Sequence, residues 1–318
     1  MIVAEDVGDE QVGRLRAAFP QLDFRVCLDR ESFIAAAPEA EIIFAKSYPP
    51  EAIRAARQLR WVQAGTAGVE RILELLRSRD DGGRDVLLTN AHGAHGIPMA
   101  ENILALMLAF AIRLPTLMQA QQERRDVSRQ VRIDKFELEG QTLCVLGLGD
   151  IGGTLARKAQ LLGMHVLGVR RSQAPFPYAH ELFTPDRLAE ALPRADHVAL
   201  CLPLTSETQA IIGAAELRLM KPAAYIYNVG RGASIDPDAL TTALREGWIA
   251  GAGLDVTCPE PLPPDSPLWA MPNVLLTQHT SGHSPFNAQR ITDIFLENLG
   301  RYLRGEPLIN RIDKTRGY

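Results

Sequence analysis

The chain has 318 residues, of which 46% are hydrophobic, and a formal net charge of −4. This length and composition predict a globular protein of about two domains, and the lack of a basic block argues against nucleic acid or a membrane surface as its partner. The four cysteines form no C-x-x-C pair, which argues against a zinc motif, predicts no metal site and favours reduced thiols in a cytoplasmic protein.

The first ninety residues predict short strands that alternate with helices. The expected elements are strands at 2–4, 24–27, 42–44, a run ending at Ala64, and 86–89, with a helix at 9–19 and a polar loop at 80–85. The turn Gly65-Thr66-Ala67-Gly68 follows one of these strands, and its freed backbone N–H groups could hold a carboxylate. An ordinary strand-to-helix turn is the alternative. Lys46, Ser47 and Tyr48 follow another strand and would either line a substrate pocket or form a plain surface loop.

A segment rich in histidine and glycine before Pro98 marks the expected domain boundary. Pro98 suits the first turn of a long helix, which we expect over residues 99–124. This helix is apolar on nearly all sides through Ala111, more than the flank of one domain requires, which predicts a subunit interface and a homodimer. His92 and His95 have a spacing open to a metal pair. No cysteine or carboxylate cluster accompanies them, so loop or cofactor-contact histidines are favoured.

From residue 143 onward, strands and helices alternate strictly. The expected strands are 143–146, 165–169, 197–200, 224–228, 251–255 and 274–276, and the expected helices between them include 154–162, 184–192 and 236–246. Six strands with crossover helices predict an α/β fold with a doubly wound parallel sheet, the Rossmann arrangement. A final helix at 287–303 lies too far along the chain for this sheet. We expect it to return to the N-terminal domain, which makes that smaller domain discontinuous.

The first of these strands leads into a glycine turn of the form G-x-G-x-x-G. Gly147 permits the tight turn, Gly149 lets a pyrophosphate approach the backbone, and Gly152 lets the next helix pack closely on the strand. The anion would lie at the helix N-terminus, where free N–H groups and the helix dipole favour negative charge. The predicted contacts of a dinucleotide in this turn are Gly147, Leu148, Gly149, Asp150 and Ile151.

Two arginines stand where an NAD-binding turn usually has an acidic residue, about 20 positions beyond the glycines. These residues are Arg170 and Arg171, and Ser172 follows them. Guanidinium groups can bind a 2′-phosphate in a bidentate way, whereas a carboxylate would repel it. The sequence therefore favours NADPH over NADH, with arginines that are merely solvated as the alternative.

Three polar stretches follow predicted strands, at the edge where ligands of open α/β sheets bind. They are 228–234, 253–263 and 277–283, and they present Arg231, Asp255, Glu260 and His279. An arginine between glycines suits a substrate carboxylate or carbonyl, and a histidine backed by a glutamate is the arrangement expected of a proton donor. A surface salt bridge or a helix cap is the alternative for each residue taken singly. Together they predict a catalytic site.

These motifs resemble those of the D-isomer-specific 2-hydroxyacid dehydrogenase family. The matching segments are GLGDIG, CLPLTSET at 201–208, NVGRG, GLDV followed by PEPLP, and QHTSGH. The resemblance covers essentially the whole chain. It implies a substrate domain of flavodoxin-like α/β fold at 1–94 and 284–318, a coenzyme domain at 95–283, and an active site between them.

The resemblance also implies roles for individual residues. Arg231 would anchor the substrate, Glu260 would be the partner of His279, His279 would be the acid and base, and Asp255 would contact the nicotinamide end of the coenzyme. The turn 65–68 would hold the substrate carboxylate. Further coenzyme contacts implied by the matching segments are Leu202, Pro203, Thr208, Val229, Gly230 and Gly282.

The sequence departs from the family pattern near the histidine. Gln278 replaces the usual proline, Ser281 stands where alanine is common, and His283 follows at i+4. These departures leave the substrate open. The arginine pair resembles the NADP-using 2-ketoacid or glyoxylate/hydroxypyruvate reductase branches. We expect NAD(P)H to reduce a small 2-oxo acid with His279 as proton donor, and a non-catalytic NAD(P)-sensing regulator of corepressor type is the alternative.

Overall fold

The computed structural model describes residues 2–5, 7–79 and 85–317, so most of the polar loop predicted at 80–85 lies outside the described residues. The chain divides into two compact units, Met1–His95 with Ser284–Tyr318, and Gly96–His283. The first crossing between them falls one residue after the predicted boundary.

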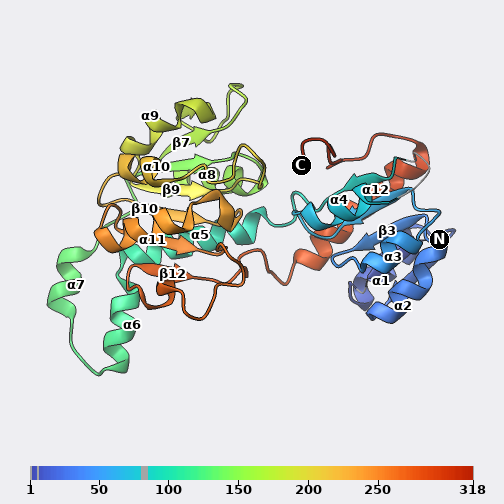
Figure 1. The fold of residues 1–318 in the computed structure, drawn as a ribbon, viewed down its shortest axis with the longest axis horizontal. Coiled ribbons are helices and arrows are strands. Elements are labelled where there is room, and N and C mark those ends of the chain that lie inside the picture. Colours follow the sequence, from blue (N-terminus) through green and yellow to red (C-terminus); the bar gives the residue numbers. More distant parts are fainter. Residues whose placement is uncertain (1, 6, 80–84, 318) are drawn as a thin grey trace. The chain divides into compact units, whose positions relative to one another are not determined.

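The first unit contains a parallel sheet of five strands (Figure 1). The strands are β1 (Ile2–Glu5), β2 (Phe24–Cys27), β3 (Ile42–Ala45), β4 (Trp61–Ala64) and β5 (Leu87–Thr89). Their order, β2-β1-β3-β4-β5, is that of flavodoxin, and this confirms the predicted fold class of the smaller unit.

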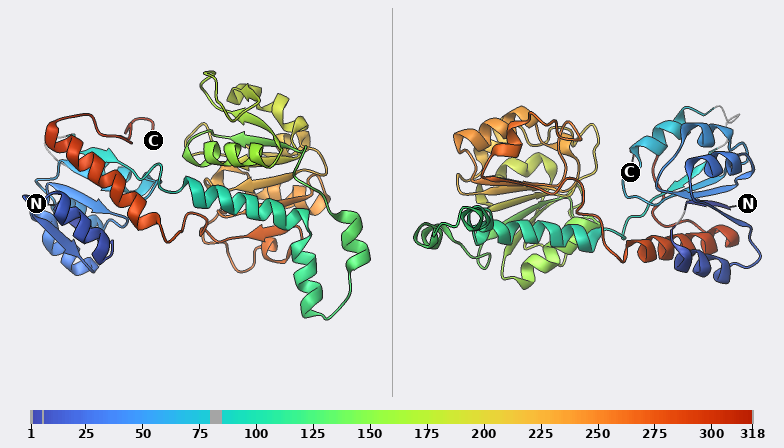
Figure 2. Two further views of the ribbon diagram at one scale, coloured as in Figure 1. Left: turned by 180° about the vertical axis from the view of Figure 1, so that it is seen from behind. Right: turned by 90° about the horizontal axis from the view of Figure 1, so that it is seen from below.

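Helices cover both faces of this sheet (Figure 2). The helices are α1 (Asp9–Ala18) and α12 (Asn287–Arg304) on one face, and α2 (Arg30–Ala36), α3 (Pro50–Ala55) and α4 (Glu70–Arg77) on the other. Side chains of β1 alternate between the faces, since Ile2 and Ala4 pack with α1 and α12, and Val3 packs on the opposite side. The rings of Phe44 and Phe295 stack with 4.3 Å between centroids, which fixes the last helix on this sheet.

The second unit contains a parallel sheet of seven strands, where the sequence predicted six. The strands are β6 (Thr142–Leu146), β7 (His165–Val169), β8 (Glu181–Phe183), β9 (His197–Leu200), β10 (Tyr225–Asn228), β11 (Gly251–Leu254) and β12 (Val274–Leu276). Their order is β12-β11-β10-β9-β6-β7-β8, the doubly wound Rossmann order. The sequence does not predict β8, because this strand has only three residues and only Phe183 among them is buried.

Helices also cover both faces of the seven-stranded sheet (Figures 1 and 2). They are α5 (Gly96–Ala111) and α8 (Asp150–Leu161) on one face, and α9 (Leu188–Ala191), α10 (Ala214–Leu219) and α11 (Pro237–Glu246) on the other. Short 3-10 turns are η1 (Ala37–Glu39), η2 (Pro185–Arg187), η3 (Leu192–Arg194), η4 (Gly232–Ser234) and η5 (Pro267–Ala270). The doubly wound fold predicted for this unit is confirmed.

The single long helix predicted over 99–124 is wrong. It is two helices, α5 and α6 (Leu114–Gln122), bent by 66° at Arg113, whose φ of 59° is left-handed. Pro115 lies in the first turn of α6, where proline starts a helix rather than continuing one. A further helix, α7 (Ser128–Asp134), follows, and α6 and α7 extend away from the sheet as an arm (Figure 1). No single described helix is long and apolar enough to span a membrane, and α5 with α6 passes that test only as a bent pair, by length and composition.

Candidate functional site

The turn between β6 and α8 has the backbone that a bound pyrophosphate requires. Gly147 has a φ of +91°, which favours glycine, and its N–H donates to the carbonyl of Val169 at 2.9 Å. A Cβ atom at position 152 would lie 1.9 Å from the carbonyl oxygen of Gly147, so the helix can start this close to the strand only with glycine there. Gly149 is the N-cap, and among the described residues no side chain caps this end of α8. The N–H groups of its first turn are therefore available to an anion.

The two arginines after β7 have different surroundings. The Nε of Arg170 donates to the carbonyl of Ser172 at 2.7 Å, and its guanidinium carbon lies 5.7 Å from the ring centroid of Phe176. Arg171 forms an exposed ion pair with Glu207 at 2.5 Å. Arg170 is thus held at the strand end, whereas the charge of Arg171 is shared with a carboxylate.

The loop after β9 contains three of the predicted coenzyme contacts, Leu202, Pro203 and Thr208. The hydroxyl of Thr208 donates to the carbonyl of Pro203 at 2.6 Å and accepts from the N–H of Thr205 at 2.8 Å, which closes the loop on itself. A Cβ atom at position 230 would lie 2.5 Å from the carbonyl oxygen of Leu202. This loop therefore packs against the turn that carries Arg231.

The turn after β10 presents Arg231. Asn228 holds this turn, because its side chain donates to the carbonyl of Arg231 at 2.9 Å and accepts from the N–H of Gly230 at 3.0 Å. The half-buried guanidinium donates to the carbonyl of Gly230 at 2.9 Å. A Cβ atom at position 232 would lie 1.9 Å from the carbonyl oxygen of Thr257, so this turn lies against the loop after β11.

His279 and Glu260 form a pair between the loops after β12 and β11. The Nδ1 of His279 is hydrogen-bonded to Oε1 of Glu260. A carboxylate can only accept, so Nδ1 carries the proton and Nε2 faces away from this partner. The two side chains are 53% and 38% exposed, so a substrate can reach the ring.

Asp255 is buried at the end of β11, with 1% of its surface exposed. Its carboxylate accepts from the hydroxyl of Thr277 at 2.6 Å, from the N–H groups of Thr280 and Ser281 at 3.0 and 3.1 Å, and from the hydroxyl of Ser281. Its backbone carbonyl accepts from the N–H of His279 at 2.5 Å. Asp255 thus holds the loop that carries His279.

Sheet register explains why these loops meet. Asn228, Leu254 and Leu276 are partners across β10, β11 and β12, so the three strands end at the same edge. The structure therefore gathers four predicted residues on one unit: Arg231, Asp255, Glu260 and His279. Val229 is buried in the core beside α5, and Gly282 lies in the loop after β12. Sequence analysis did not single out Asn228, Thr277 or the bonding of Ser281, although Asn before a glycine turn is a signal for side-chain-to-backbone bonding.

The first unit carries the turn 65–68 and Lys46. A Cβ atom at position 65 would lie 2.7 Å from Cγ of Lys46, so the two predicted substrate-binding segments lie side by side. The backbone N–H groups of Thr66, Ala67 and Gly68 donate no hydrogen bond within the described part of the chain. Three adjacent free N–H groups suit a carboxylate. Tyr48 instead is buried and donates to the carbonyl of Ala45, so it belongs to the core.

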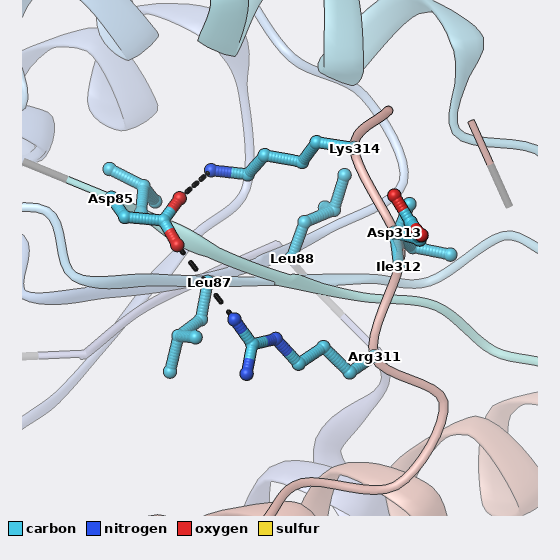
Figure 3. A pocket seen from close by; sticks show the side chains of 8 residues that line it. Asp85, Leu87, Leu88, Arg311, Ile312, Asp313 and Lys314 are labelled. Carbon is cyan, nitrogen blue, oxygen red and sulfur yellow. Dashed lines mark hydrogen bonds and ion pairs between the residues drawn. The ribbon is translucent and has the colours of Figure 1, made fainter. Parts of the chain in front are cut away.

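A pocket lies elsewhere on the first unit, between β5 and the C-terminal segment (Figure 3). It is lined by 85–88 and 311–314. Asp85 is paired with Lys314 at 2.5 Å and with Arg311 at 3.8 Å. None of the predicted site residues lines this pocket, so it does not define the site.

Two titratable groups, one on β9 and one in the loop that follows it, have pKa values that do not suit acid–base or nucleophilic chemistry near neutral pH. Burial raises the pKa of Cys201, in the loop after β9, to about 12, so its thiol is not a nucleophile near neutral pH. Burial also lowers the pKa of His197 to about 4. Among the described residues, no group of three or more His, Cys, Asp and Glu could hold a metal ion.

A doubly wound sheet with an uncapped glycine turn, and a histidine–glutamate pair on neighbouring strand ends, defines the class of nicotinamide-dependent dehydrogenases. The model of the D-isomer specific 2-hydroxyacid dehydrogenase NAD binding domain matches residues 104–281. The chain belongs to this family, and the resemblance seen in the sequence is confirmed. It is an enzyme that acts on a CH–OH group with NAD or NADP.

Relatives cover nearly the whole chain. A glyoxylate reductase from Korarchaeum cryptofilum is 35% identical over 271 residues, which are 80% of this chain and 76% of the relative. The crystal structure of a D-isomer specific 2-hydroxyacid dehydrogenase family protein from Aeromonas salmonicida is 33% identical, covers 98% of both chains and has a TM-score of 0.87. The structure of a D-isomer specific 2-hydroxyacid dehydrogenase from Xanthobacter autotrophicus in complex with NADPH and MES is 31% identical, with a TM-score of 0.84 over 100% of this chain and 99% of that chain.

Proposed function

We propose that this protein reduces a small 2-oxo acid to a D-2-hydroxy acid, with His279 as the proton donor. The observation that carries this proposal is the pair formed by His279 and Glu260 at the end of the sheet. The glutamate fixes the ring and leaves Nε2 directed away from it. Membership of the family gives the class of reaction, and the pair of His279 and Glu260 provides a proton donor for it.

A bound dinucleotide supplies the hydride that adds to C2 of the substrate. The residues that fit it are the glycine turn, with Gly147 in a glycine-favouring conformation and the uncapped start of α8. As negative charge develops on the carbonyl oxygen, the imidazolium of His279 donates the Nε2 proton to it. Glu260 stabilises the charged ring during this step.

Two groups would bind the substrate carboxylate and carbonyl. Arg231 offers a planar guanidinium that is held by its own turn, and this supports a role in anchoring the substrate. The free N–H groups of Thr66, Ala67 and Gly68 support carboxylate binding by the first unit. Lys46 lies beside that turn and adds positive charge there.

We propose NADPH as the preferred coenzyme. Arg170 is held at the strand end beside Ser172, where a 2′-phosphate could accept from its guanidinium. Arg171 supplies a second positive charge that is shared with Glu207. The relative from Xanthobacter autotrophicus was crystallised with NADPH, which supports this choice.

Glyoxylate is the first substrate to test, because the relative from Korarchaeum cryptofilum is a glyoxylate reductase. The experiment follows absorbance at 340 nm with glyoxylate, hydroxypyruvate, pyruvate and a bulkier 2-oxo acid, each with NADPH and with NADH. Oxidation of NADPH by one or more of these acids is expected. No oxidation across the panel, with coenzyme still bound, would favour the non-catalytic regulator instead.

We also propose a homodimer formed through the arm. Large apolar side chains are exposed on α5, α6 and nearby segments; they are Leu108, Ile112, Leu114, Met118 and Ile133. A second copy of the chain would cover them. Light scattering should give twice the mass of the chain, and a monomer at micromolar concentration would exclude the dimer. All four cysteines are free thiols, which supports the proposed cytoplasmic location.

A further inference from the structure

The turn that carries His279 has an unfavourable backbone. Gln278 has a φ of 50° and His279 a φ of 57°, so two successive residues other than glycine adopt the left-handed conformation. Such a conformation is less favourable than the right-handed one for a residue that carries a Cβ atom. Interactions elsewhere in the loop must therefore hold this turn.

The Asp255 carboxylate supplies those interactions. Four donors reach this carboxylate: the hydroxyl of Thr277 and the N–H groups of Thr280 and Ser281 donate to Oδ1, and the hydroxyl of Ser281 donates to Oδ2. The N–H of His279 donates to the carbonyl of the same aspartate. Residues before, at and after the histidine are thus tied to a single residue that is 1% exposed.

We infer that the hydroxyls of Thr277 and Ser281, bound to Asp255, are positioning groups for His279. They lie two residues before and two residues after the histidine, and their bonds keep the turn left-handed, so that Nδ1 meets Glu260 and Nε2 points away. Two of the four bonds use backbone N–H groups, which every variant keeps. Side-chain substitution can therefore remove only the two hydroxyl bonds from this set of four bonds to Asp255. The inference rests on the proposed role of His279 as proton donor.

The experiment compares Ser281→Ala and Thr277→Val with Thr277→Ser, which keeps the hydroxyl. Ser266→Ala is the matched control, since it removes a serine hydroxyl that caps η5 in the same unit. Each variant is assayed for kcat with a 2-oxo acid, for the Kd of NADPH by fluorescence titration, and for thermal unfolding. Ser281→Ala and Thr277→Val should lower kcat about tenfold or more with the Kd of NADPH changed less than twofold. Thr277→Ser and Ser266→Ala should match the wild type.

Wild-type kcat in both Ser281→Ala and Thr277→Val would overturn the inference. A fall in kcat accompanied by a weaker Kd for NADPH and a lower melting temperature would also overturn it. That pattern would indicate that the variant destabilises the whole unit and does not act on His279 alone. His279→Ala in the same assay separates this outcome from failure of the proposed function. Full activity in His279→Ala would overturn both the proposed function and this inference. An inactive His279→Ala beside fully active Ser281→Ala and Thr277→Val would overturn the positioning role of the hydroxyls alone.

Discussion

His279 is hydrogen-bonded through Nδ1 to the carboxylate of Glu260, a residue 19 positions earlier in the chain. The two belong to loops that follow neighbouring strands, β12 and β11, and the parallel register of those strands brings them together. Because the carboxylate takes Nδ1, the opposite ring nitrogen, Nε2, faces away from Glu260 and would carry the proton in the proposed reaction. This contact orients the exposed ring of His279, as the proposed role of proton donor requires.

Removing the charge of Glu260 should slow the reaction. Glu260→Gln can still accept from Nδ1 but no longer stabilises a charged ring, so kcat should fall about 10- to 100-fold at constant Kd for NADPH. Steady-state kinetics with a 2-oxo acid measures this fall. Glu246→Gln, an exposed glutamate at the end of α11, is the control, and equal kcat values for the two variants would show that the carboxylate of Glu260 plays no part.

Arg231 should matter through the geometry of its guanidinium. Arg231→Lys keeps the charge but loses the planar fork that binds a carboxylate or carbonyl in a bidentate way, so KM for the 2-oxo acid should rise about tenfold or more. Arg245→Lys, on the exposed side of α11, serves as the control. If KM stayed at its wild-type value in both variants, Arg231 would not bind the substrate.

Coenzyme preference should respond to the residues around the two arginines. Arg170→Asp should shift the ratio of kcat/KM for NADPH and NADH toward NADH, because a carboxylate repels a 2′-phosphate. Glu207→Gln should lower KM for NADPH a few-fold without changing that for NADH, since it releases Arg171 from an exposed ion pair worth at most about 1 kcal/mol. An unchanged ratio in Arg170→Asp would remove the basis for choosing NADPH.

The buried His197 should make stability depend on pH. Its Nε2 donates to Gln141 at 2.6 Å and its Nδ1 accepts from the hydroxyl of Tyr227 at 3.1 Å. Burial lowers its pKa to about 4, below the value of about 6.5 in an unfolded chain, so the unfolded state binds the proton first as pH falls. The contribution to stability is complete above pH 6.5 and is lost between pH 6.5 and 4, by about 1.4 kcal/mol per pH unit.

Urea unfolding at several pH values between 7 and 4 measures this loss. His197→Gln keeps polar partners for its neighbours but does not titrate in this range, so its unfolding free energy should depend less steeply on pH than that of the wild type. Equal slopes for the two proteins would show that His197 is not the group responsible.

Much of the fold could be predicted from the sequence because its strands are short runs of buried apolar residues between helices. His165–Val169 and His197–Leu200 match the predicted bounds. The strand β8 could not be found this way, since edge pairing with β7 and not a buried pattern defines it. The break at Arg113 was missed because the apolar pattern continues past it, although Pro115 marks the start of a new helix.

The candidate site, too, could be predicted only as far as local sequence patterns reach. Residues that follow strands, such as Arg231 and His279, could be predicted because parallel strands end at one edge. The bonds between Asp255 and Ser281 could not, since they join residues 26 apart and depend on the register of β11 and β12 and on the left-handed turn between them. The position of Tyr48 after a strand predicts either a pocket lining or a surface loop, whereas its side chain is buried in the core.

The role of His279 is tested most directly by the turnover of His279→Ala. With NADPH and a 2-oxo acid that the wild type reduces, kcat should fall by about 10²- to 10⁴-fold, while the Kd of NADPH measured by fluorescence stays within about twofold of the wild type. Wild-type turnover in this variant would contradict the account, because the proton would then come from another group.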